Sequence, residues 1–333
     1  MIFSDLRHYV STLEKIGHLQ VIEGASCELE IGAITEMATA RANSPTVLFD
    51  SIQGHKKGFR VLTNFLSHRT RERMVYGVDE NLSDSEAVKF WKNKLKTVTP
   101  IDPKELGSGP VKENVMVGDQ VDLTKFPWPR WHQRDGGPYL CATAAITRDP
   151  DSGYINVGSY RYMLLDKNTI VAHIGSGHHG DVIRKKYWAK GKSCPTAISL
   201  GQEPALFETA GTNLSWGASE YGFAGWMRGA PVEVTKGVAT DLPIPAGAEV
   251  VLEGEMLPPE EGTQIEGPFG EMSGYYGGGA RPAPITVIKS VLYRNDPIIL
   301  GSPPFLGTSR GILSSRGILI WNELEALGIP NII

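Results

Sequence analysis

The change in hydrophobic pattern near residue 110 constrains the fold more than any other feature of the sequence. From there on, short runs alternate apolar and polar residues, and turn residues separate them at spacings of about ten residues, which is typical of a β-barrel or β-sandwich. The whole chain contains 38 glycines and 22 prolines, which fits a fold with many turns. The predicted strands lie at 140–149, 154–166, 169–175, 231–239, 249–257, 285–295 and 297–304.

The first part of the chain has an α/β pattern instead. Helices are predicted at 5–17, 29–42 and 83–96, and strands at 46–50 and 59–66. Ser4 is the expected N-cap of the first helix. The polar, Pro- and Gly-rich stretch 99–114 marks a domain boundary. The predicted division is an α/β domain at 1–105, a β-domain at 106–307 and a connecting helix at 308–333.

Further helices are expected at 179–191, 219–229 and 315–328. After the last one, "IPNII" (329–333) begins an apolar strand and the chain stops. A chain rarely ends within a buried strand, so we expect a C-terminal part to be absent from this polypeptide.

Composition excludes several classes of protein. The 333 residues are 41% hydrophobic and 21% charged with a formal charge of −4, so nothing suggests nucleic-acid binding. The sequence contains neither a long apolar run nor a secretory signal, and no membrane span is expected. Three widely separated cysteines fit a reducing compartment. A cytoplasmic protein is predicted.

Three constellations could carry chemistry. Asn156 and Arg161 lie on one predicted strand, and an arginine fork binds carboxylate or phosphate. His178 and His179 lie in a glycine-rich turn before a helix, and Glu220 lies in the first turn of another. Asn, His and Glu together suit Mg²⁺ or Mn²⁺ holding a phosphate. The alternatives are a surface arginine, a chance histidine pair, and an acid placed by the helix dipole.

The segment "IEGPFGEMSGYYGGG" (265–279) carries two carboxylates, Glu266 and Glu271, on a backbone too rich in glycine for a helix. Solvated acids on a turn are the simplest interpretation. However, the bends at Gly267 and Gly270 also allow both carboxylates to face one cavity.

Several motifs together resemble one family, the UbiD-type reversible decarboxylases, which depend on prenylated FMN. The motifs are "FPWPRWHQRDGGPYL", "YINVGSYRYM", "HIGSGHH", "ASEYGFAG" and "EGPFGEMSGYY", and the resemblance is collinear from about residue 5 to the end. It implies an N-terminal α/β domain followed by a flavin-reductase-like split β-barrel. A third domain, which closes the active site and builds homo-oligomers, would start where this sequence stops. A family lysine that reaches the cofactor phosphate therefore has no counterpart here, which leaves the activity of this polypeptide open.

The resemblance also implies a cofactor site. A Mn²⁺ or Mg²⁺ ion that anchors the flavin phosphate would be held by Asn156, His179 and Glu220, and binding of K⁺ is left open. The residues implied to lie against the cofactor are Asn156, Val157, Gly158, Ser159, Tyr160, Arg161, His178, His179 and Glu220. A flavin prenyltransferase would supply the cofactor.

A Glu–Arg–Glu network of the family corresponds to Glu266, Arg161 and Glu271. Arg161 is expected to lower the pKa of one carboxylate, so that Glu266 orients Arg161 and Glu271 donates the proton after CO₂ leaves. The substrate would be an aromatic, heteroaromatic or α,β-unsaturated carboxylic acid. Three alternatives remain: a carboxylase component of a larger complex, a cofactor-binding module without activity, and an assembly protein.

Overall fold

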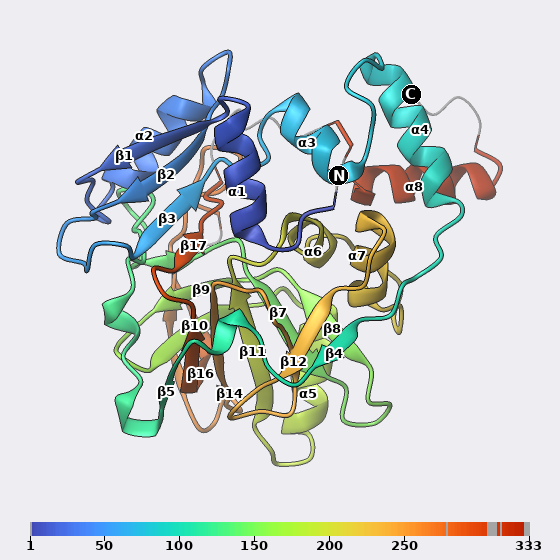
Figure 1. Ribbon diagram of the computed structural model, residues 1–333. Helices are drawn as coiled ribbons and strands as arrows, with labels where there is room; N and C mark the ends of the chain where they lie inside the picture. The colour runs from blue at the N-terminus through green and yellow to red at the C-terminus, as the bar shows by residue number, and fades with distance from the viewer. Residues whose placement is uncertain (1, 278, 305–311, 314, 330–333) are drawn as a thin grey trace.

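The computed structural model describes residues 2–277, 279–304, 312–313 and 315–329 and shows a mixed α/β fold built on three sheets (Figure 1). The helices are α1 (Leu6–Lys15), α2 (Glu30–Thr39), α3 (Arg69–Tyr76), α4 (Asp84–Leu95), α5 (His179–Trp188), α6 (Pro204–Ala210), α7 (Glu220–Arg228) and α8 (Ser315–Ala326). The strands are β1 (Leu19–Glu23), β2 (Thr46–Asp50), β3 (Arg60–Thr63), β4 (Lys104–Leu106), β5 (Asn114–Val117), β6 (Tyr139–Leu140), β7 (Ala144–Arg148), β8 (Ile155–Gly158), β9 (Arg161–Leu164), β10 (Thr169–His173), β11 (Cys194–Leu200), β12 (Glu233–Lys236), β13 (Pro243–Pro245), β14 (Val250–Met256), β15 (Thr263–Glu266), β16 (Arg281–Tyr293) and β17 (Ile298–Leu300).

The N-terminal sheet has the strand order β1-β2-β3-β17. Strand β17 pairs in parallel with β3, and Ile299 lies opposite Val61. The strand expected at 297–304 is therefore present, but it belongs to this sheet and not to the β-domain series in which the sequence placed it. The division into domains at 105 and 307 itself stays a prediction.

The large sheet has ten strands, eight of them in the order β6-β9-β10-β16-β14-β11-β7-β8, with β15 and β5 also paired to β16. The long strand β16 is central to this sheet, because β10, β14, β15 and β5 all pair with it. A register shift between Glu253 and Gly254 bends β14 against β16. A Cβ at Gly254 would lie 2.2 Å from the carbonyl oxygen of Val287, so only glycine fits there. Within the described residues, β6 and β8 do not pair with each other, and the sheet does not close into a barrel.

Two local predictions were wrong. Asp5, not Ser4, caps α1, because its carboxylate accepts a hydrogen bond from the His8 N–H at 2.8 Å. The run 154–166 is not one strand: β8 pairs with β7, whereas β9 pairs with β10 and β6. The chain turns between the two strands at Ser159 and Tyr160, so Asn156 and Arg161 lie on different strands.

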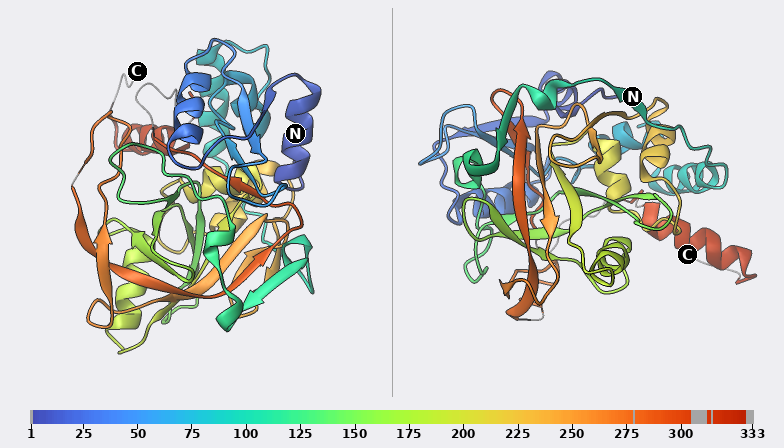
Figure 2. Two further views of the ribbon diagram at one scale, coloured as in Figure 1. Left: turned by 90° about the vertical axis from the view of Figure 1, so that its left-hand side faces the viewer. Right: turned by 90° about the horizontal axis from the view of Figure 1, so that it is seen from below.

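The helices near the predicted site lie between and beside the sheets. Figure 1 shows α6 and α7 below α3. The right view of Figure 2 shows α8 projecting from the molecule beside α4. Helix α8 packs on α4, where the Asn322 side-chain N–H donates to the Lys92 carbonyl oxygen at 3.2 Å. The apolar strand expected at 329–333 lies almost entirely outside the described residues.

Cys27, Cys141 and Cys194 are all free thiols. Among the helices that the structure describes, none combines the length and the apolar character that a membrane span needs.

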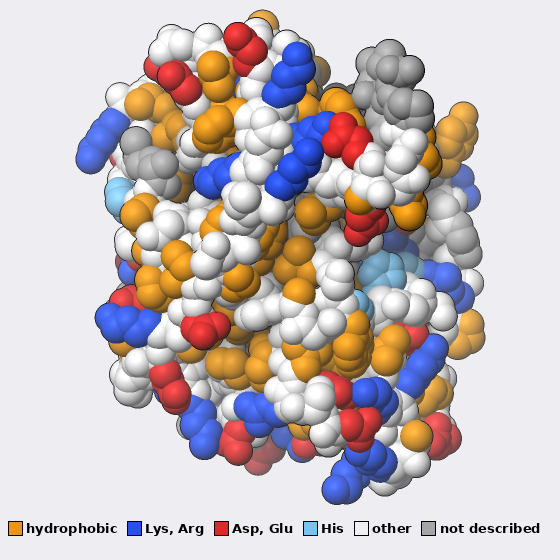
Figure 3. Space-filling model, turned by 90° about the vertical axis from the view of Figure 1, so that its right-hand side faces the viewer, with side chains coloured by type: hydrophobic (Ala, Val, Ile, Leu, Met, Phe, Trp, Pro, Cys, Tyr) orange, Lys and Arg blue, Asp and Glu red, His pale blue; other side chains and the backbone are white. Residues whose placement is uncertain are grey.

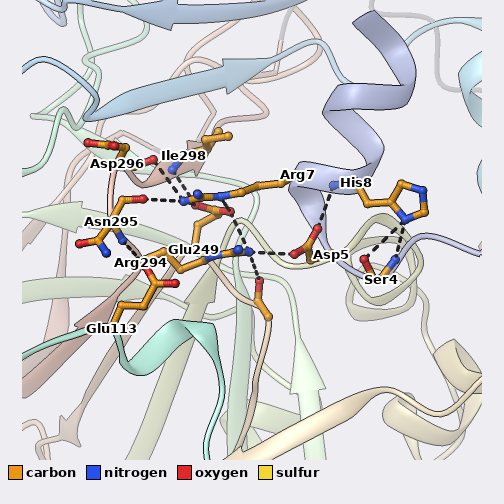
Figure 4. A network of polar contacts seen from close by, with 11 residues as sticks. Ser4, Asp5, Arg7, His8, Glu113, Glu249, Arg294, Asn295, Asp296 and Ile298 are labelled. Atoms are coloured by element: carbon orange, nitrogen blue, oxygen red, sulfur yellow. Dashed lines mark hydrogen bonds and ion pairs between the residues drawn. The ribbon is translucent and has the colours of Figure 1, made fainter. Parts of the chain in front are cut away.

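A buried ion network joins the first helix to the large sheet (Figure 4). The fully buried Glu249 accepts two hydrogen bonds from Arg7, both at 2.8 Å, and one from the Ile298 N–H at 3.1 Å. Arg294 lies 3.4 Å from Glu249 and 2.9 Å from Asp5. Glu249 therefore connects α1, the end of β16 and the start of β17.

We expect Glu249→Gln to lower the free energy of unfolding by about 3–5 kcal/mol, because it removes the buried carboxylate that pairs with both Arg7 and Arg294. Urea denaturation measures this directly. Glu255→Gln is the control, since Glu255 pairs with Lys289 on the surface and such pairs contribute about 1 kcal/mol or less. Equal losses in the two variants would contradict the role given to Glu249.

Candidate active site

Nearly all predicted cofactor residues line one cavity of about 450 Å³. Strand β8, the turn that follows it, the start of α5, the loop after α6 and the start of α7 form its walls. The lining residues are Asn156, Val157, Gly158, Ser159, Tyr160, Ser176, Gly177, His178, His179, Ala210, Gly211, Thr212, Asn213, Leu214 and Glu220. Arg161, which directly follows Tyr160 in the chain, is not among these lining residues.

Tyr160 fixes one wall of the cavity. Its hydroxyl accepts a hydrogen bond from the Gly180 N–H at 3.1 Å, and a Cβ at Gly180 or Gly158 would lie within 2.7 Å of that hydroxyl oxygen. The two glycines therefore allow the tyrosine ring to lie against the start of α5. On the face of the molecule shown in Figure 3, histidine side chains reach the surface close to hydrophobic, lysine and arginine side chains.

Glu220 is the buried acid of the cavity. It is 3% exposed, and its carboxylate accepts hydrogen bonds from the Val157 N–H at 3.2 Å and from the Tyr154 hydroxyl at 3.0 Å. Burial raises the pKa of Glu220 to about 7, although these hydrogen bonds act to lower it. No lysine or arginine of the described chain forms an ion pair with it or lines the cavity.

His179 lies beside Glu220 and begins α5. Burial, followed by the nearby His178, lowers its pKa, which favours the neutral imidazole that binds metals. Its Nδ1 lies 3.4 Å from the Tyr154 hydroxyl, which also donates to Glu220. The predicted ligands His179 and Glu220 therefore contact the same hydroxyl group.

These residues fit a divalent cation. A buried carboxylate without a cationic partner, a neutral imidazole and the Asn156 amide offer the N and O donors that Mn²⁺ or Mg²⁺ takes. Among the described residues, no group of three or more His, Cys, Asp and Glu side chains is arranged to hold a metal. An ion here would therefore depend on the Asn156 amide and on ligand oxygens, and the metal remains a prediction.

The second cluster is the predicted Glu–Arg–Glu network, and the structure brings its members together. Arg161 Nε lies 3.0 Å from Glu266 Oε1, and Arg161 Nη1 lies 2.5 Å from Glu271 Oε1. The guanidinium also stacks over the Phe269 ring, 4.6 Å from its centre. Burial lowers the pKa of Arg161, but Glu266 and then Glu271 outweigh burial and raise it.

The two glutamates have different surroundings. The Glu266 side chain is fully buried, whereas the Glu271 side chain is 37% exposed. Glu266 also accepts a hydrogen bond from the Tyr139 hydroxyl at 3.0 Å and lies 3.4 Å from His173 Nδ1. Gly267, at φ 89°, turns the chain after Glu266, which is the bend that the sequence predicted.

Glu266 is held in its charged form. Burial raises its pKa, but hydrogen bonds from His173 and Arg161 and the charge of Arg161 outweigh burial and lower the pKa from 4.5 to about 2. The lowered pKa expected for one carboxylate therefore belongs to Glu266, the residue predicted to orient Arg161.

This shift predicts a pH dependence of stability. A carboxyl whose pKa falls on folding stabilises the native state above its unfolded pKa and loses that contribution as pH falls through its folded pKa. Glu266 should therefore contribute about 3 kcal/mol at pH 7, lost between its ordinary pKa of 4.5 and about 2. Urea unfolding should show that the free energy of unfolding falls less between pH 7 and pH 3 in Glu266→Gln than in wild type. Equal losses would contradict the assignment.

Sequence reasoning missed several residues of both clusters. Tyr139 and His173 lie within motifs of the resemblance, but an aromatic or a single histidine on a strand looks like an ordinary core residue. The loop 210–214 carries only small and polar residues apart from Leu214. The helix before it, α6, was not predicted from the sequence either.

The chain matches family models and known relatives over most of its length. Residues 104–305 match the 3-octaprenyl-4-hydroxybenzoate carboxy-lyase Rift-related domain (UbiD), and residues 10–91 match the N-terminal domain of the same carboxy-lyases (UbiD_N). The chain is 36% identical over 313 residues to pyrrole-2-carboxylic acid decarboxylase from Pseudomonas aeruginosa, covering 90% of this chain and 62% of the relative. It is 34% identical to phenolic acid decarboxylase from Bacillus subtilis, covering 91% and 65%. The chain thus spans somewhat less than two thirds of these relatives.

Solved structures give the same result. The vanillic acid decarboxylase from Sedimentibacter hydroxybenzoicus in its closed form superposes with a TM-score of 0.85 at 31% identity, covering 92% of this chain and 65% of that one. The UbiD-class enzyme HmfF from Pelotomaculum thermopropionicum, in an evolved dimeric form in complex with prFMN, superposes with a TM-score of 0.84 at 28% identity, covering 95% and 70%.

Proposed function

Because the chain belongs to the UbiD family of carboxy-lyases, we propose that it binds prenylated FMN and serves the reversible, non-oxidative decarboxylation of an unsaturated carboxylic acid. The observation that carries the proposal is Arg161 bridging Glu266 and Glu271 in a chain whose other predicted cofactor residues line one cavity. Relatives named for pyrrole-2-carboxylic and phenolic acids support an aromatic or heteroaromatic substrate.

The large sheet would form the flavin-reductase-like split barrel of the family, with the cofactor phosphate in the cavity at β8 and α5. A phosphate there needs positive charge, and the lining residues supply no lysine or arginine. We infer that Mn²⁺ or Mg²⁺ held by Asn156, His179 and Glu220 neutralises it. The bound prenylated flavin would act as the electron sink for loss of CO₂.

Arg161 would bind the substrate carboxylate by exchanging one partner. Glu266 is buried and held from several sides, whereas Glu271 is more exposed and contacts only one guanidinium nitrogen. A substrate carboxylate can therefore take the place of Glu271 on Arg161 while Glu266 keeps the guanidinium oriented. Once displaced from Arg161, Glu271 is free to carry a proton.

Glu271 would then deliver that proton to the carbon that has lost CO₂. In the carboxylation direction the same residue would remove the proton. Both directions use the same groups, so a carboxylase component of a larger complex is an alternative with the same site. Exchange of labelled bicarbonate into the acid, with product present, would identify it.

The proposal is tested by turnover. The chain, co-expressed with a flavin prenyltransferase as cofactor supplier, is incubated with a panel of aromatic, heteroaromatic and cinnamic acids, and the decarboxylated products are measured by chromatography. We expect turnover of at least one aromatic or heteroaromatic acid, dependent on the prenyltransferase. Cofactor retention without turnover or CO₂ exchange of any acid would favour a cofactor-binding module instead.

His179→Ala is expected to lower both metal content and flavin occupancy by about 10-fold or more, because it removes one of three proposed protein ligands. Elemental analysis and flavin absorbance of the purified proteins measure the two quantities. His55→Ala is a matched control, since His55 lies outside the cavity. Unchanged metal and flavin in His179→Ala would remove His179 from the ligand set.

A further inference from the structure

Among the residues that the structure describes, Tyr154 is the one side chain outside the proposed ligand set with a polar contact to both His179 and Glu220. Its hydroxyl lies 3.0 and 3.2 Å from the two Glu220 carboxylate oxygens and 3.4 Å from His179 Nδ1. A single hydroxyl can donate one hydrogen bond and accept others. It can therefore donate to the carboxylate and accept from the imidazole at the same time.

We propose that Tyr154 is the positioning residue of the metal site: His179 Nδ1–H donates to the Tyr154 hydroxyl, which donates to Glu220. This inference rests on the proposed function. With the proton fixed on Nδ1, His179 presents the lone pair of Nε2 to a metal. The same hydroxyl restricts the rotation of the Glu220 carboxylate, so both ligands are oriented before the ion arrives.

The backbone around Tyr154 is held rigidly enough for this role. Tyr154 follows the turn between β7 and β8, where the Asp149 N–H donates to the Tyr154 carbonyl oxygen at 2.8 Å. Lys186 of α5 lies 2.8 Å from the buried Asp149 carboxylate and 3.2 Å from Asp151. These ion pairs connect the turn before Tyr154 to the helix that begins with His179.

Trp216 covers the pair from outside. Its ring centre lies 5.3 Å from that of Tyr154 and 5.1 Å from that of His179. Such contacts limit rotation of both rings.

The test measures Mn²⁺ binding rather than activity. Wild type, Tyr154→Phe and the control Tyr187→Phe are titrated with Mn²⁺, alone and with FMN, and free Mn²⁺ is followed by electron paramagnetic resonance. Tyr187 lies on α5 about two turns after His179 and lines a different pocket. We expect Tyr154→Phe to weaken Mn²⁺ binding by about 10- to 100-fold and Tyr187→Phe to leave it unchanged.

A second readout needs no metal. In wild type with ¹⁵N-labelled histidine, long-range ¹H–¹⁵N correlation should show His179 protonated on Nδ1, with its signal assigned by its loss in His179→Gln, and Tyr154→Phe should give a mixture of tautomers. An Nε2–H tautomer in wild type would overturn the inference even if the variant failed to fold. Equal Mn²⁺ affinity of wild type and Tyr154→Phe would overturn it and leave the proposed function standing. No Mn²⁺ binding by wild type, with or without FMN, would overturn both the inference and the proposed metal site.

Discussion

Replacing Glu271 with glutamine is expected to lower kcat for decarboxylation by about 10³- to 10⁴-fold, the upper part of the range for general acid–base catalysis, with flavin and metal content unchanged. Glutamine has nearly the same shape and still accepts a hydrogen bond from Arg161 Nη1, which contacts Glu271 in the native protein. It cannot carry a titrating proton. The change therefore removes the proposed proton donor and little else.

Glu261→Gln is the matched control for this experiment. Glu261 lies on the exposed turn before β15, so the same chemical change there should leave kcat within about 2-fold of wild type. Labelling with D₂O adds a second readout, because proton delivery is the step assigned to Glu271. Near-normal turnover in Glu271→Gln would refute the assignment.

Replacing Arg161 with lysine should lower kcat/KM by about 10³-fold, comparable to losing a donor that stabilises a developing charge. Lysine keeps the positive charge but has no planar fork. It cannot contact Glu266 through two nitrogens and Glu271 through a third, as Arg161 does. The substrate carboxylate and Glu271 would then lose their common alignment.

The matched control for Arg161→Lys is Arg69→Lys. Arg69 is an exposed residue at the start of α3 that forms an ion pair with Asp84. We expect Arg161→Lys to keep its flavin, since Arg161 does not line the cavity. A variant that keeps wild-type kcat/KM would show that charge alone suffices and would contradict the proposed exchange of partners.

Local patterns in the sequence predicted most of the helices and many of the strands. Helix α4, for example, lies within the predicted range 83–96 and follows Ser83, whose side chain forms a capping box with Glu86. Long-range pairing was less accessible: β17 joins β3 through backbone hydrogen bonds that either strand could make with another partner. Periodicity within one segment cannot identify its neighbour in a sheet. The same limitation led the sequence to predict β8 and β9 as one strand.

The residues of the site were likewise only partly predictable from the sequence. Side-chain chemistry grouped Asn156 and Glu220 with the histidine pair 178–179, and the family resemblance selected His179. All of these residues line one cavity. Tyr154 and Tyr139 were not identified, because an aromatic residue beside a strand is usually part of the core. Only their hydroxyl contacts to Glu220 and Glu266, known from the structure, distinguish them.

The central claim is that this chain carries prenylated FMN together with a divalent metal. Its most direct test is mass spectrometry of small molecules released from the purified protein, produced with and without a flavin prenyltransferase, alongside elemental analysis. We expect prenylated FMN only in the co-expressed sample, with Mn²⁺ or Mg²⁺ in stoichiometric amount. Folded protein from both preparations that releases no flavin and holds no metal would contradict it.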